Sequence, residues 1–168
     1  MDLIQKLPMF INAAAYQVYL QDQDLMSLEG NEQAVAFRFA IYFNELVKDH
    51  LPEGVVLDTE YNKIGVDPKH INVQKIKDDE AQEHGIRPDI ILHQRKTSNA
   101  NLLVIECKRG SNKDFNDFNK LKAMTSDPSY QYRLGCYINF AKIEPEFTYF
   151  VDGEITENLA KVIIWVGS

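Results

Sequence analysis

Two apolar runs separated by a polar interval, in RPDIILHQRKTSNANLLVIECKRG at residues 87–110, constrain the fold more than any other feature of the chain. Short apolar runs bounded by polar residues are typical of buried strands, and here they predict strands over residues 89–92 and 102–107. Strands joined by a short polar loop usually pair antiparallel. The sequence therefore predicts a hairpin whose open end carries Pro-Asp on one strand and Glu-Cys-Lys on the other.

The register of this hairpin follows from its loop, because directly opposed residues in an antiparallel pair have numbers with a constant sum. A loop centred between Thr97 and Ser98 gives a sum of 195, which places Asp89 opposite Glu106. Opposed side chains project from the same face, and Lys108, two residues after Glu106, projects from it as well. We therefore expect two carboxylates and one amine close together at one end of the hairpin.

Such a cluster suggests a divalent metal site. Two carboxylates held together repel each other unless a cation joins them, and hard oxygen ligands suit Mg²⁺ or Mn²⁺. The simpler interpretation is a solvated strand end at which Lys108 only neutralises the acids, since charged residues commonly mark sheet edges. The combination of Pro-Asp before one strand with Glu-x-Lys at the end of the next favours the metal site.

The other segments predict helices and strands around this hairpin. Apolar periodicity and turn residues predict helices over 9–24, 31–50 and 116–126, strands over 54–61, 132–140 and 146–153, a long polar loop over 62–85, and an ambiguous segment over 157–166. Asn31 is the expected N-cap of the second helix. The order predicts one α/β domain over residues 1–168, with a mixed sheet of about four to five strands flanked by helices.

Length and composition fit one folded domain, since 168 residues with 45% hydrophobic and 26% charged side chains bury a sizeable core. No run approaches the roughly 18 apolar residues of a membrane span, and no basic leader is evident, so we expect a cytoplasmic protein without membrane contact. Cys107 and Cys136 lie in apolar runs without metal-ligand spacing, which predicts reduced core cysteines rather than a disulfide or zinc site.

The net charge of −7 weighs against a dedicated nucleic-acid binder, whose surface is usually basic. The charge is unevenly distributed, however. Residues 61–113 contain ten Lys and Arg against seven Asp and Glu, a balance of +3, and the rest of the chain has a balance of −10. The segment that contains the hairpin is thus the only basic part of the sequence.

RPDIIL followed by LLVIECKRG is similar to the signature of the PD-(D/E)XK nuclease superfamily, which has the restriction-endonuclease-like fold. The preceding NEQAVAFRFAIYF and VVLDTEYNKIG resemble a bacterial subgroup of uncharacterised proteins in that superfamily, so the resemblance covers residues 31–140. It implies a restriction-endonuclease-like core and magnesium-dependent hydrolysis of phosphodiester bonds in DNA or RNA.

The resemblance also implies roles for individual residues. Asp89 and Glu106 would ligate magnesium, and Lys108 would position or polarise the attacking water. The superfamily often adds an acid from the helix before the sheet as a further catalytic and metal-binding residue, and Glu32 stands at that place. The alternative for Glu32 is a first-turn acid stabilised by the helix dipole.

Further candidates surround these residues. Asp58 and Glu60 alternate onto one strand face, where ordinary polar strand positions are the alternative. Arg109 and Arg87 flank the motif and are candidates for phosphate contacts. The aromatic side chains of the second half are expected to pack in the core rather than stack on bases: Phe115, Phe118, Tyr130, Tyr132, Tyr137 and Phe140.

Two other functions remain open. A catalytically inactive nuclease-fold protein that binds or regulates a protein partner fits the acidic exterior, because an acidic body repels polyanions. A hydrolase of a small phosphorylated ligand would meet less repulsion than an enzyme acting on nucleic acid. A homodimer is plausible for the nuclease, since cutting both strands of a duplex needs two sites.

Overall fold

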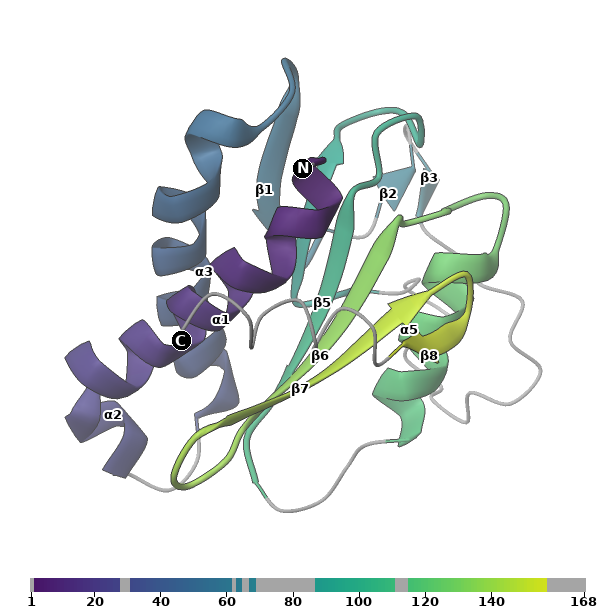
Figure 1. Ribbon diagram of the computed structural model, residues 1–168. Helices are drawn as coiled ribbons and strands as arrows, with labels where there is room; N and C mark the ends of the chain where they lie inside the picture. The colour runs from purple at the N-terminus through teal and green to yellow at the C-terminus, as the bar shows by residue number, and fades with distance from the viewer. Residues whose placement is uncertain are drawn as a thin grey trace.

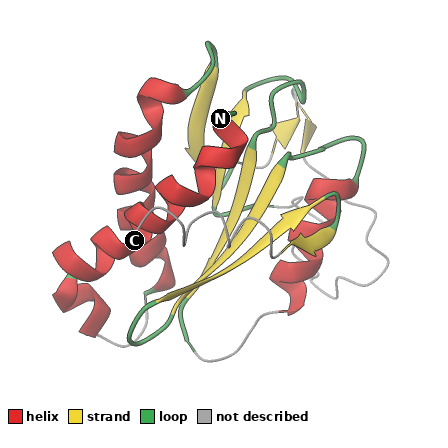
Figure 2. Ribbon diagram, viewed as in Figure 1, coloured by secondary structure: helices red, strands yellow, loops and turns green. Residues whose placement is uncertain are grey.

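A six-stranded mixed sheet with helices on both faces forms the centre of the protein (Figures 1 and 2). The computed structural model describes residues 2–27, 31–61, 63–64, 67–68, 87–110 and 115–156. The helices are α1 Leu3–Gln21, α2 Gln23–Ser27, α3 Glu32–Val47, the 3₁₀ helix η1 Lys48–His50, and α5 Phe115–Ser126. The sheet has the order β1 Val55–Thr59, β4 Ile90–Gln94, β5 Leu103–Lys108, β6 Leu134–Phe140, β7 Pro145–Val151, β8 Glu154–Thr156. A separate pair consists of β2 Lys63–Ile64 and β3 Asp67–Pro68.

All neighbouring strands in the six-stranded sheet pair antiparallel except β5 and β6, which are parallel. A parallel pair needs a crossover connection, and α5 lies in that connection. Figure 1 shows α1 and α3 on one side of the sheet and α5 on the other. The α/β class and the mixed sheet are therefore as the sequence predicts.

The predicted hairpin register is confirmed. Ile90 pairs with Ile105 and Leu92 pairs with Leu103, so the opposed residues have the expected constant sum. The bounds differ slightly from the prediction, since β4 begins at Ile90 and Asp89 lies just before it. The register is well specified because both faces of the two strands are buried, which leaves little freedom to slip.

Alternation of side chains along the strands divides the core into two parts. Ile90 and Ile105 face α1 and α3, in a core that includes Phe39 and Phe43. Ile91, one residue further along β4, faces the opposite side, where Leu121 and Met124 of α5 are buried. Three aromatic side chains are buried in the same core, as predicted: Tyr130, Tyr132 and Tyr137. Phe140, in the first core, is likewise buried as predicted.

Local signals explain how the helices on the first face begin. Asn31 caps α3 as predicted, because its side chain accepts a hydrogen bond from the backbone N–H of Ala34 over 3.0 Å. The first helix begins earlier than the predicted residue 9, since the Gln5 side chain accepts the Asp2 backbone N–H over 3.1 Å and closes the first turn. It ends at Gln21, and the short α2 follows, so the predicted helix is confirmed over residues 9–21 and its predicted end at residue 24 is wrong.

Other predictions need correction. The sheet has six strands rather than four to five, because Asp152 and Gly153, with φ of 51° and 80°, form a turn that ends β7 and starts β8. Phe115 was expected to pack in the core, but it is 80% exposed at the start of α5. Phe118 does pack as predicted, with its ring edge-to-face against Phe150 at 5.3 Å between centroids.

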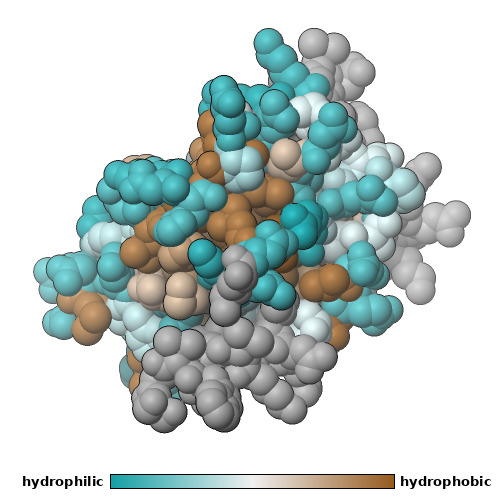
Figure 3. Space-filling model, turned by 45° about the horizontal axis from the view of Figure 1, so that its top comes forward, coloured by the Kyte–Doolittle hydropathy of each residue, from teal (hydrophilic) through white to brown (hydrophobic). Residues whose placement is uncertain are grey.

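The two cysteines are buried and free, as predicted. The segment over 157–166 and nearly all of the loop over 62–85 lie outside the described residues. Within the described ranges, no helix combines the length and the apolar character needed to cross a membrane. On the face shown in Figure 3, hydrophobic side chains gather in the centre and hydrophilic ones surround them.

Candidate active site at the open end of the central hairpin

Asp89 is the central residue of the candidate site. It lies mostly buried immediately before β4, and its Oδ2 accepts a hydrogen bond of 2.7 Å from the backbone N–H of Cys107. Burial, together with the negative charges of Asp117 and Glu32, raises the pKa of Asp89 to about 6, although the Cys107 hydrogen bond and Lys120 oppose the shift. The charged form of this carboxyl is therefore disfavoured by its surroundings.

Glu106 is the second predicted carboxylate, and it is only 3% exposed. It projects from β5 toward α5, where the Nζ of Lys120 lies 3.9 Å from its Oε2. The same Nζ lies 2.9 Å from Oδ1 of Asp117, one turn earlier on α5. Burial alone would lower the Lys120 pKa, but Glu106 and Asp117 outweigh it and raise that pKa above its ordinary value.

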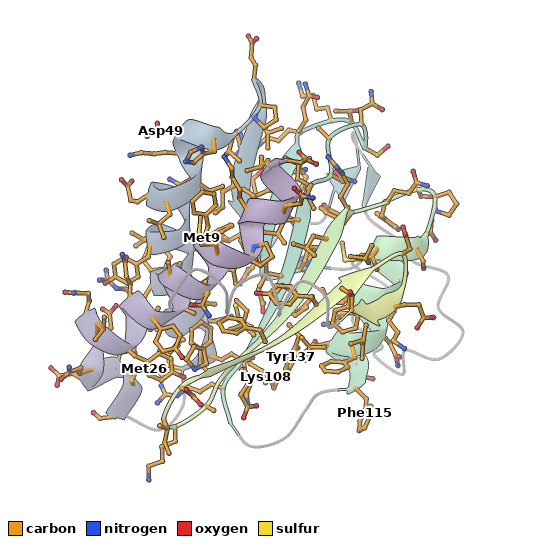
Figure 4. The ribbon with its side chains drawn as sticks, viewed as in Figure 1. Met9, Met26, Asp49, Lys108, Phe115 and Tyr137 are labelled. Atoms are coloured by element: carbon orange, nitrogen blue, oxygen red, sulfur yellow. The ribbon has the colours of Figure 1, made fainter. Side chains whose placement is uncertain are left out.

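Lys108 and Glu32 meet at the end of β5. The Nζ of Lys108 lies 3.5 Å from Oε1 of Glu32, and the other oxygen of Glu32 accepts the backbone N–H of Arg109 over 3.0 Å. Glu32 thus reaches from the first turn of α3 to the last residues of the strand. Figure 4 shows Lys108 between Met26 of α2 and Phe115 of α5 in this view.

The four predicted catalytic residues therefore lie around one end of the β4–β5 hairpin, but with different neighbours from those expected. The amine of Lys108 reaches Glu32, and the amine beside Glu106 is that of Lys120. Reasoning from sequence missed Lys120 and its partner Asp117. The sequence did carry a signal for them: Asp117 and Lys120 fall on the same side of the predicted helix as the apolar Leu121 and Met124, which are buried.

A pocket of about 520 Å³, open solvent included, brings two of these residues to the surface. Glu32, the first residue of α3, and Asp89, the residue before β4, both line it. Its remaining walls come from α3, from β1 and the residue after it, and from the first residue of β4: Gln33, Ala36, Phe37, Thr59, Glu60 and Ile90.

Glu60 lines the pocket and has an unusual backbone conformation. Its φ of 51° is unusual for a residue other than glycine, and its N–H donates a 3.1 Å hydrogen bond to the carbonyl of Asp89. This bond holds the segment before β4 against the end of β1. Asp58, in contrast, is engaged on β1 with Nε2 of His93 at 2.9 Å and Nε of Arg95 at 2.8 Å.

The two arginines predicted to contact phosphate have different surroundings. Arg109 donates from its guanidinium to the carbonyls of Leu25 and Met26, over 2.8 and 2.7 Å, and so anchors α2 to the end of β5. Arg87 is exposed, two residues before Asp89. Of the two, Arg87 is the exposed one.

The donor set suits a divalent cation in its chemistry. Asp89, Glu106 and Glu32 offer the carboxylate oxygens that Mg²⁺ and Mn²⁺ prefer. Burial is the main cause of the raised Asp89 pKa, with the charges of Asp117 and Glu32 adding to it, and a bound cation would favour the ionised carboxylate. Across the described ranges, however, no three acidic, histidine or cysteine side chains are grouped closely enough to hold a metal as they stand. Binding would therefore require these side chains to move toward one another.

No protein-family model matches the sequence, and neither characterised proteins nor solved structures give a match. The class of protein is thus defined by its own structure, an α/β protein with a six-stranded mixed sheet flanked by helices.

Proposed function

We propose that the protein is a magnesium-dependent nuclease of the PD-(D/E)XK type, with a restriction-endonuclease-like core, that hydrolyses phosphodiester bonds in DNA or RNA. The observation that carries the proposal is Asp89, a largely buried carboxyl whose pKa is raised to about 6 and which lines an open pocket with Glu32. Carboxyl groups with strongly perturbed pKa values in a cleft are typical of functional sites. A structural role gives no reason to hold Asp89 near two further acids, Glu32 and Asp117.

Asp89, Glu106 and Glu32 would hold the cation, Mg²⁺ or Mn²⁺. When bound, the cation supplies Lewis-acid chemistry, polarising a phosphoryl oxygen and stabilising the leaving oxygen. The backbone N–H of Cys107 orients the Asp89 carboxylate through its 2.7 Å hydrogen bond.

The two lysines have separate tasks in this proposal. Lys108, at the solvent-accessible end of β5, positions the attacking water and adds positive charge where negative charge develops. Glu32 holds the Lys108 amine in place at 3.5 Å. Lys120 lies deeper, where its amine offsets the repulsion between Glu106 and Asp117, at 3.9 Å from the first and 2.9 Å from the second.

The test is incubation with single- and double-stranded DNA and RNA, with Mg²⁺, Mn²⁺ or a chelator. Lys108→Ala and Asp89→Ala are expected to abolish cleavage, and the chelator is expected to abolish it in the wild type. Lys48→Ala is the matched control, because Lys48 is an exposed lysine just after the C-terminus of α3, far along the helix from Glu32. Cleavage that persists in both site variants would contradict the assignment.

The second candidate is a catalytically inactive nuclease-fold protein that acts through a protein partner. The net charge of −7 favours it, because an acidic body repels nucleic acid. The engagement of the Arg109 guanidinium with α2 favours it too, since that residue is then less available for phosphate. Calorimetry that detects metal binding, together with no cleavage of any substrate, would select this function.

A further inference from the structure

An exposed aromatic side chain lies on the wall of the pocket that contains the candidate carboxylates. Phe37 of α3 is 60% exposed, whereas Phe39 and Phe43 of the same helix are fully buried. A single exposed apolar residue is ordinary on a protein surface. Phe37 differs because it shares its pocket with Glu32 and Asp89, so its ring is presented beside the proposed cation ligands.

The pocket combines three kinds of surface. Phe37 supplies an aromatic face. Gln33 and Thr59 supply polar groups able to hydrogen-bond a base edge. Glu32, Glu60 and Asp89 supply carboxylates. An apolar face with convergent polar groups and a charged region is the pattern of a ligand site.

We propose that Phe37 is a stacking platform for one unpaired base, so that the site takes single-stranded nucleic acid. This assignment rests on the proposed nuclease function. A base stacked on the Phe37 ring would bring its nucleotide into the pocket that Glu32 and Asp89 also line. In a duplex the bases are stacked on one another, and one reaches a protein ring only after it has been unpaired and flipped out at a cost in free energy.

The charge of the protein supports stacking as the source of affinity. Binding through phosphate contacts requires several Lys and Arg side chains, and the chain has a net charge of −7. Of the two arginines predicted to contact phosphate, Arg109 binds two carbonyls of α2. Base–aromatic stacking needs no positive surface, because every base has a π-face that a ring can cover.

The experiment measures binding separately from cleavage. Fluorescence anisotropy would report the affinity of the full chain for a short dye-labelled single-stranded oligonucleotide and for its duplex, with Ca²⁺ in place of Mg²⁺. The variants are Phe37→Ala, Phe37→Leu and Phe37→Trp. Ile41→Ala is the matched control, since Ile41 is the exposed apolar residue one turn further along α3 and lies outside the pocket wall. Circular dichroism checks that each variant is folded. Because Phe37 is exposed, its replacement is expected to leave the fold intact.

Phe37→Ala and Phe37→Leu are expected to weaken single-strand binding by about five- to a hundred-fold, the range of one base–aromatic stack. Phe37→Trp should retain or improve it, and Ile41→Ala should leave it unchanged. The stacking role is overturned if the wild type binds and Phe37→Leu binds equally well, or if the duplex is bound as tightly as the single strand. A wild type that binds neither form overturns the nuclease proposal as well, so the two failures are distinguishable.

Discussion

At the scale of single residues, Asp89 is held in a position that opposes its own ionisation. Its ordinary pKa of 3.8 is raised to about 6, mainly by burial. An acid whose folded-state pKa is raised favours folding only while it is protonated. Its contribution is complete below the unfolded pKa near 3.8 and is lost as the pH rises through about 6. The shift of about two pKa units corresponds to a free-energy cost of about 3 kcal/mol at neutral pH.

The Asp89→Asn variant is therefore expected to be more stable than the wild type at neutral and alkaline pH, while losing activity. The amide oxygen can still accept the Cys107 N–H, and the buried negative charge is gone. We expect the free energy of unfolding to rise by about 1–3 kcal/mol at about pH 8 and to be nearly unchanged at about pH 4.

Urea unfolding at the two pH values measures this difference directly. The prediction is contradicted if the variant is less stable than the wild type at the higher pH, or if its free energy of unfolding changes equally at both pH values. Asp89 would then stabilise the fold through its hydrogen bond, without an unfavourable buried charge.

At the scale of secondary-structure elements, the hairpin and its register were predictable and the partners of its charged ends were not. The β4–β5 register follows from two buried runs and one loop, which is local information. The contact between Lys120 and Glu106 depends on how α5 packs across the sheet, which no local pattern determines. The β7–β8 turn did carry a local signal, because Asp-Gly between strands favours a tight hairpin.

The contacts of Arg109 were not predictable from the sequence for the same reason. Arg109 lies beside the predicted motif, but its guanidinium binds α2. No residue of α2 is fully buried, although Leu25 and Met26 pack against the core, and these two hydrogen bonds join α2 to the end of β5. Arg109→Met should raise the rate of amide hydrogen exchange across residues 22–27 with little change in global stability.

Measurement of single-strand binding at several salt concentrations tests the alternative role of Arg109, a phosphate contact. If the guanidinium contacts phosphate instead, Arg109→Met will reduce the slope of binding affinity against salt concentration by about one phosphate contact. Arg87→Met is the matched comparison, because Arg87 is exposed and is expected to change that slope without affecting exchange in α2.

At the scale of the whole molecule, the topology gathers charged residues from four separate elements. Glu32 comes from the start of α3, Asp89 from the residue before β4, Glu106 from β5 and Lys120 from the crossover helix α5. Antiparallel β4 and β5 bring the first strand's beginning to the second strand's end, and the parallel β5–β6 pair requires the crossover that places α5 beside them. The account depends on these carboxylates acting as one site for a divalent cation.

Thermal unfolding with and without Mg²⁺, at constant ionic strength, tests that dependence most directly. At a Mg²⁺ concentration about ten times the dissociation constant, a bound ion stabilises the wild type by about 1.4 kcal/mol. For a chain of this size the midpoint should then rise by about 3–6 °C. Asp89→Asn and Glu106→Gln should show no such rise. An equal rise in all three proteins, or none in the wild type, would contradict the account.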